Sequence, residues 1–200
     1  MDFPRFMMLL ENHTLFFSKA TNLGSKYEGE YSYVDKKWNQ ILYKDNISRG
    51  IVNKSLKNFK YDNEIHRECV FINCWHINDH ESNLLWNYYA WQNGIAIQST
   101  FGNVIKSFNK TPETIFGGPV NYIDYFEDSM PDENILFPFV HKPLFFKDEH
   151  ELRFLTYVDP NSRLYKKYLK MNGKNIQIDI DILIESIFLF PSSELWIYVF

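Results

Sequence analysis

The chain has 200 residues, of which 45% are apolar and 18% are Phe, Trp or Tyr. That length fits one domain, and the aromatic content can supply a sizeable core because each buried ring removes roughly 150–250 Å² from water. The composition therefore argues against a chain that is disordered over most of its length. With 21 basic and 25 acidic residues, the net charge of −4 gives no basic footprint for duplex DNA.

The sequence also argues against a membrane partner and a secreted protein. No uncharged apolar run approaches the roughly 18 residues of a membrane-spanning helix, and the N-terminal stretch MDFPRFMMLLEN carries an acid in place of a basic leader region. Cys69 and Cys74 are five residues apart in one expected strand, so their side chains point to opposite faces and should not form a disulfide. We therefore expect a reduced, cytoplasmic protein.

The apolar pattern predicts helices and strands mixed along one α+β domain, with a twisted, mixed or mostly antiparallel sheet flanked by helices. Helices are predicted near the N-terminus and in 33–59, 101–108 and 166–169. Strands are predicted in 14–18, 69–75, 95–100, 120–123, 151–158, 176–182 and 184–190. The chain stops on the apolar run 195–200, which predicts a tail that packs on a protein partner or a second copy, or a fold that continues beyond it.

The segment NCWHINDHESNLLWNYY, residues 73–89, is the densest in reactive groups. One interpretation is structural: Asn78 caps a helix that runs to about Trp91, and Glu81 completes a capping box. A second is a metal site built from Cys74, His76 and His80, although no further pair of ligands completes a closed set. The third is an active-site corner, because a helix start after a strand offers free N–H groups to an anion.

A second constellation is the run Glu149-x-Glu151-x-Arg153. If the run is extended, its three charged side chains share one face of a strand. The structural interpretation is a solvated strand face with a bidentate Arg–Glu pair. The catalytic interpretation assigns one glutamate to a ribose hydroxyl or an oxocarbenium-like transition state, and the other to the acceptor.

In chain order, these motifs resemble a bacterial family known as domain of unknown function 2971. The resemblance covers nearly the whole chain and rests on Leu15-Phe16-Phe17-Ser18, Tyr27-Glu28-Gly29, Asn73-Cys74-Trp75-His76, Glu81-Ser82, Trp86, Tyr89, Gly94, Val120, Tyr122, Lys142 and Glu149-x-Glu151-x-Arg153. Ser25-Lys26 stands where such proteins have Asp-Pro. The resemblance implies an α+β fold over 1–200 that is incomplete at its C-terminus, and it adds Glu28, Glu81 and Lys142 to the ligand-binding candidates.

The leading hypothesis is a nucleotide-handling enzyme, similar to ADP-ribosyltransferases and using NAD. Glu151 would be the key carboxylate, with Glu149 and Arg153 as its neighbours, because the E-x-E run is similar to the paired glutamates of arginine-specific ADP-ribosyltransferases. The expected pocket for a base or ribose comprises Trp75, His76, Ser82 and Trp86. The rival hypothesis is a non-enzymatic module that binds a ligand or protein, as in stress or phage defence.

Overall fold

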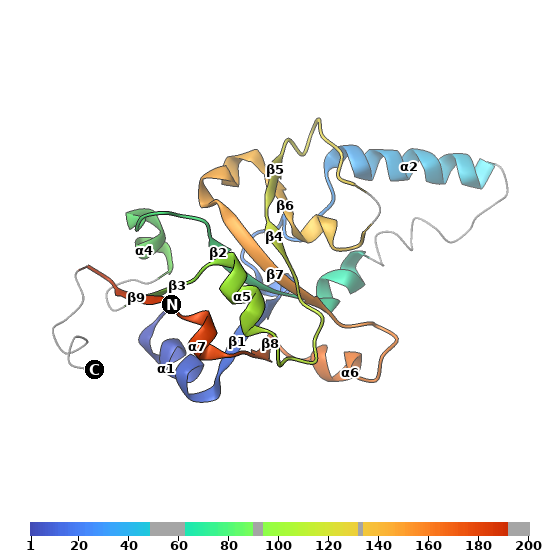
Figure 1. Ribbon diagram of the computed structural model, residues 1–200. Coiled ribbons are helices and arrows are strands. Elements are labelled where there is room, and N and C mark those ends of the chain that lie inside the picture. Colours follow the sequence, from blue (N-terminus) through green and yellow to red (C-terminus); the bar gives the residue numbers. More distant parts are fainter. Residues whose placement is uncertain (49–62, 90–93, 132–133, 192–200) are drawn as a thin grey trace. The chain divides into compact units, whose positions relative to one another are not determined.

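The computed structural model describes residues 1–48, 63–89, 94–131 and 134–191 (Figure 1). The chain divides into two compact units, each built from separate stretches of sequence. Unit 1 comprises Met1–Phe16, Asn78–Ile115 and Asn175–Phe200, and unit 2 comprises Phe17–Ile77 and Phe116–Lys174. Helices combine with a mainly antiparallel sheet, which confirms the predicted α+β class.

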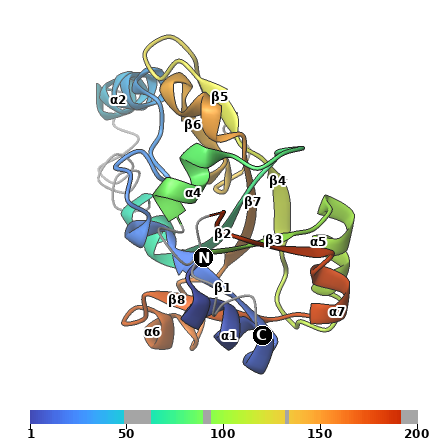
Figure 2. The same cartoon turned by 90° about the vertical axis from the view of Figure 1, so that its left-hand side faces the viewer.

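Unit 1 pairs a small sheet with short helices. Its two-stranded antiparallel sheet joins β3 (Ile95–Gln98) to β9 (Ser186–Leu189), which lie side by side in Figures 1 and 2. Its helices are α1 (Phe3–Asn12), α4 (Asn83–Tyr89), α5 (Phe101–Ser107) and α7 (Ile180–Leu183). The side chain of Asp2 caps α1 by accepting a hydrogen bond of 2.9 Å from the Arg5 N–H. The predicted N-terminal helix is thereby confirmed.

Unit 2 is built on a five-stranded sheet with the strand order β4–β7–β2–β1–β8. Its strands are β1 (Thr14–Lys19), β2 (Val70–His76), β4 (Phe116–Pro119), β7 (Glu151–Tyr157) and β8 (Gly173–Gln177); the boundary between the units falls within β1 and β8. The central pair, β2 and β7, is antiparallel and in register from Val70↔Tyr157 to His76↔Glu151. Both strands were predicted, because each is rich in β-branched and aromatic residues.

The other elements of unit 2 surround this sheet. They are α2 (Tyr33–Ser48), α6 (Tyr165–Tyr168), the 3₁₀ helices η1 (Ala20–Asn22), η2 (Phe137–Phe139) and η3 (Leu144–Glu149), and a parallel pair of short strands, β5 (Asn121–Ile123) and β6 (His141–Pro143). Residues 63–69 are also helical. The second helix expected in 33–59 and the apolar run 195–200 lie outside the described residues.

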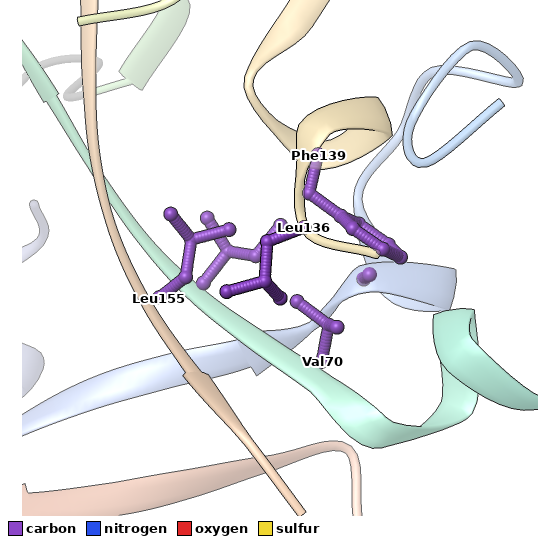
Figure 3. Packing of buried hydrophobic residues seen from close by; sticks show 6 residues of the cluster. Val70, Leu136, Phe139 and Leu155 are labelled. Atoms are coloured by element: carbon purple, nitrogen blue, oxygen red, sulfur yellow. The ribbon is translucent and has the colours of Figure 1, made fainter. Parts of the chain in front are cut away.

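One face of the sheet is covered by η2. Leu136 and Phe139 pack over Val70 and Leu155, and Figure 3 shows this cluster from close by. Phe139 is fully buried. The same face of β7 continues from Leu155 to Arg153 and then Glu151, because alternate residues of a strand share a face. Charged side chains therefore begin where this apolar core ends.

Two sequence predictions need correction. Helix α4 begins at Asn83, not after Asn78, because the Ser82 hydroxyl and carbonyl accept the N–H groups of Leu85 and Trp86. The alternating run 176–182 is not one strand: β8 ends at Gln177 and α7 begins at Ile180. Apolar and polar residues keep alternating through Asp179, which has an extended backbone between β8 and α7. The alternation alone therefore could not show where the strand ends.

Gly29 provides a test of the packing against Phe139 of η2, the segment that covers one face of the sheet. Its φ is +69°, and a Cβ at this position would lie 2.3 Å from a ring carbon of Phe139. We expect Gly29→Ala to lower the free energy of unfolding by at least about 1–3 kcal/mol, as measured by urea denaturation. Gly24→Ala is the matched control, since nothing lies within 4 Å of its Cβ position. Equal effects of the two substitutions would contradict the tight approach.

Candidate functional site

The centre of unit 2 contains a buried guanidinium. Arg153 is only 1% exposed. Its two terminal nitrogens bind the two carboxylate oxygens of Glu28 at 2.6 and 3.0 Å. They also donate to the Phe139 carbonyl at 2.7 Å and to the Glu151 carboxylate at 2.9 Å. This bidentate geometry joins the turn at Glu28, the η2 segment and strand β7 at one side chain.

A buried ammonium lies beside the guanidinium. The Nζ of Lys142 lies 2.7 Å from the Glu149 carboxylate, 3.3 Å from that of Glu151 and 3.5 Å from that of Glu28. Its charge also lies 4.4 Å from the centre of the Phe146 ring. We call these five residues the ion cluster: Glu28, Lys142, Glu149, Glu151 and Arg153. In it, three carboxylates share two cations.

The charges in the ion cluster stabilise one another's ionised forms. Burial alone raises the pKa of Glu151, but Arg153 and Lys142 outweigh burial and hold that pKa below its usual value. Burial likewise opposes the charge of Lys142, yet the neighbouring glutamates raise its pKa above the ordinary range. Glu151 and Lys142 therefore stay charged at neutral pH, and removal of one partner would leave the other charges buried without compensation.

Strand β2 brings two further reactive side chains to the same face. Cys74 is the register partner of Arg153, and His76 is the partner of Glu151. The ring Nδ1 of His76 donates to the Glu149 carbonyl at 2.7 Å, which fixes the tautomer of the neutral ring. Trp75 lies on the opposite face, where its indole N–H donates to Asn73.

Cys74 is exposed, but its thiol is not activated. Crowding by protein atoms raises its pKa well above the usual value; Arg153 opposes that rise, and Glu151 adds to it as the acceptor of the S–H hydrogen bond. The thiolate needed for nucleophilic attack is therefore scarce at neutral pH.

An aromatic cavity of about 520 Å³ opens in unit 2. Its aromatic lining consists of Tyr27, Tyr31, Tyr33, Tyr125, Phe126 and Phe145. Tyr27 stands edge-on to Tyr125 and Phe145, with ring centroids 5.6 and 5.5 Å apart. The charged side chains in the lining are Lys26, Glu30, Lys36 and Asp124. Such an apolar hollow with a few polar groups is the usual form of a small-molecule site.

The cavity and the ion cluster share the same chain segments. Tyr27 lines the cavity directly before Glu28, and Pro143 lines it directly after Lys142. Tyr125 contacts both segments, since its ring stands edge-on to Tyr27 and its hydroxyl donates to the carbonyl of His141 at 3.0 Å, next to Lys142. Burial and the nearby Glu28 carboxylate raise the pKa of Tyr125, so this hydroxyl keeps its proton. The ion cluster therefore anchors two walls of the cavity to the sheet.

The structure brings together only part of the predicted site. Glu28, Lys142, Glu149, Glu151 and Arg153 converge, with His76 close by. The prediction of a solvated strand face is wrong, because Glu151 and Arg153 are buried and Glu149 belongs to η3. His150 in the left-handed conformation separates Glu149 from β7. The bidentate partner of Arg153 is the distant Glu28, not a neighbour in the run.

The remaining candidates belong to unit 1. The carboxylate of Glu81 accepts the indole N–H of Trp86 at 2.9 Å, and Ser82 precedes helix α4. Trp86 is buried and its ring stands edge-on to Phe190. These contacts give the three residues structural roles within unit 1.

Sequence reasoning missed the aromatic cavity. Its rings come from 27–33, 125–126 and 145, which lie in turns, loops and helix starts without a periodic pattern. The available signal was the local density of aromatic residues in KYEGEYSY and YIDYFED.

The described residues form neither a metal-binding cluster nor a membrane-spanning helix. Within the described ranges, no three His, Cys, Asp or Glu side chains are placed to hold a metal ion. Likewise, none of the helices described is long and apolar enough to cross a membrane.

Comparison with known proteins leaves the resemblance named above as a hypothesis. No family model matches the sequence, and neither a curated protein nor a solved structure matches it. Function must therefore be argued from the site itself.

The ion cluster predicts an unusually large effect of one substitution. Arg153→Met keeps much of the side-chain volume but leaves two buried carboxylates without their main partner. We expect a loss of about 3–5 kcal/mol in the free energy of unfolding, measured by urea denaturation. Lys110→Met is the control, because Lys110 is 71% exposed in its pair with Asp179 and should cost no more than about 1 kcal/mol. A loss near the control value would contradict a buried, mutually dependent cluster.

Proposed function

We propose that the protein binds a nucleotide, with the base among the rings of the aromatic cavity. The observation that carries this proposal is the lining itself, six aromatic side chains around about 520 Å³. Small-molecule sites usually measure about 300–1,000 Å³, a range that includes the size of a nucleotide. Stacking of a base on an aromatic side chain contributes about 1–3 kcal/mol and tolerates any base, because every base has a π face.

The charges in the lining support a phosphorylated ligand. Lys36 is paired with Glu30 at 2.6 Å, and Glu30 is paired again with Arg67 at 2.8 Å. Lys26 lies 5.2 Å from the Tyr27 ring centre and has no ion pair among the described residues. An ammonium without a carboxylate partner, placed beside aromatic rings, suits a phosphate group attached to a stacked base.

The ion cluster supports this function by positioning, not by contact with the ligand. Arg153 is 1% and Glu151 5% exposed, and their charged atoms are occupied by one another and by Glu28 and Lys142. Their role is to hold the segments that carry Tyr27 and Pro143. A site whose supporting residues are fixed in this way loses less conformational entropy when a ligand binds.

Binding of AMP and ATP by calorimetry tests the proposal. Phe145 is 68% exposed, so Phe145→Ala should fold normally yet remove one stacking surface. We expect its dissociation constants to rise about 5- to 150-fold, the equivalent of about 1–3 kcal/mol.

Phe116→Ala is the control, since Phe116 is an exposed aromatic residue of β4 that does not line the cavity. Absence of nucleotide binding by the unaltered protein, or equal losses in the two variants, would overturn the proposal.

Transfer of ADP-ribose from NAD is the second candidate function. It is favoured by Glu149, whose side chain is 30% exposed beside Lys142 and whose backbone carbonyl accepts the hydrogen bond from His76. Glu149 is thus better placed than the buried Glu151 to act on a sugar or an acceptor.

Release of nicotinamide from NAD, followed by chromatography, tests that candidate. We expect Glu149→Gln to slow release by at least about 100-fold, the usual contribution of a general base. Glu127→Gln, on an exposed turn, is the control. If the unaltered protein releases no nicotinamide, the transferase candidate fails, whereas nucleotide binding is judged by calorimetry alone.

A further inference from the structure

A second, smaller hollow adjoins the aromatic cavity along α2. It measures about 310 Å³ and is lined by Tyr33, Val34, Lys37, Trp38, Ile41 and Phe126. Tyr33 and Phe126 line both hollows. The two spaces are therefore neighbours with a common wall, and a single ligand that crosses the wall could occupy both.

The common wall is a pair of open rings. The centroids of Tyr33 and Phe126 are 6.1 Å apart with their planes tilted by 41°, and the side chains are 60% and 77% exposed. The Tyr33 N–H donates to the Tyr125 carbonyl at 2.7 Å, which fixes the start of α2 against the aromatic cavity. The wall is thus held at its backbone while its rings present faces to both sides.

Each hollow has its own lysine. Lys26 lines the aromatic cavity and Lys37 lines the second hollow, and neither has an ion pair among the described residues. Lys36, between them in sequence on α2, is already neutralised by Glu30. Trp38 is 58% exposed in the second hollow and offers a further stacking face. Ring surfaces, and ammonium groups with no ion pair among the described residues, therefore occur twice, once on each side of the wall.

We propose that the ligand is a dinucleotide, with one base in the aromatic cavity, the other against Trp38, and the diphosphate passing over Tyr33 and Phe126 between Lys26 and Lys37. This inference rests on the proposed function and names its ligand class. A nucleotide with a single base would leave Trp38 uncovered. A dinucleotide matches both ring sites and places the two negative charges of its diphosphate between Lys26 and Lys37.

Calorimetric titration with ADP, NAD and diadenosine diphosphate tests this inference on the full chain. We expect at least one of the two dinucleotides to bind at least about tenfold more tightly than ADP. Trp38→Ala should remove that advantage while leaving the affinity for ADP unchanged, because ADP carries the diphosphate but no second base. Lys37→Gln should weaken the binding of ADP and of the dinucleotides alike, since both carry the diphosphate that lies beside Lys37. Phe145→Ala should weaken both classes of ligand, since it alters the shared first site. Lys147→Gln, an exposed lysine of η3 that lines neither hollow, is the control for charge.

The outcomes separate the two proposals. If ADP binds and neither dinucleotide binds more tightly, the dinucleotide inference is overturned and the nucleotide site stands. An equal loss of ADP and dinucleotide affinity in Trp38→Ala also overturns it, because the second hollow would then not be specific to a second base. If neither ADP nor the dinucleotides bind, the proposed function itself fails.

Discussion

The ion pair between Arg153 and Glu28 is the constraint on which the rest of unit 2 depends. Transfer of a guanidinium from water to a site that is 1% exposed costs several kcal/mol, and only close, multiple hydrogen bonds to carboxylates offset this cost. Arg153 has two such carboxylates and a backbone carbonyl. Its Nε nevertheless lacks a hydrogen-bond partner among the described residues, which leaves part of the cost in place.

A buried ion pair of this kind is better explained by specificity than by stability. Apolar residues of similar volume often stabilise a core as well or better, but they do not select one partner. Here the bidentate geometry selects one position for the turn at Glu28, and Gly29 permits that turn only by its positive φ and its lack of a Cβ against Phe139. The rings of Tyr27, directly before Glu28, and of Tyr31, just after Gly29, are thereby held at defined positions around the cavity.

Local sequence was sufficient for the strands but not for the site. The run from Val70 to His76 and the run from Glu151 to Tyr157 could be predicted because their composition alone favours extended backbone. Strand β4, with two glycines and a proline, has no such composition and is formed by pairing with β7. The partner of Arg153 lies 125 residues away, and no spacing rule connects positions at that distance. The resemblance that singled out Glu28 and Lys142 gave no indication that the two side chains would be buried together.

The burial of the ion cluster also changes how its charged run should be interpreted. Two glutamates beside an arginine suggest catalysis when they are imagined on an exposed strand, because a reacting carboxylate must reach its substrate. In the folded chain Glu151 has its charge balanced by Arg153 and Lys142, which holds its pKa low and makes it a poor general base. Only Glu149, displaced into η3 by the left-handed His150, retains contact with solvent. The run Glu149-x-Glu151-x-Arg153 thus consists of a buried ion pair, Glu151 with Arg153, and one accessible carboxylate. The chemistry of the site must therefore be sought at Glu149 and among the aromatic rings.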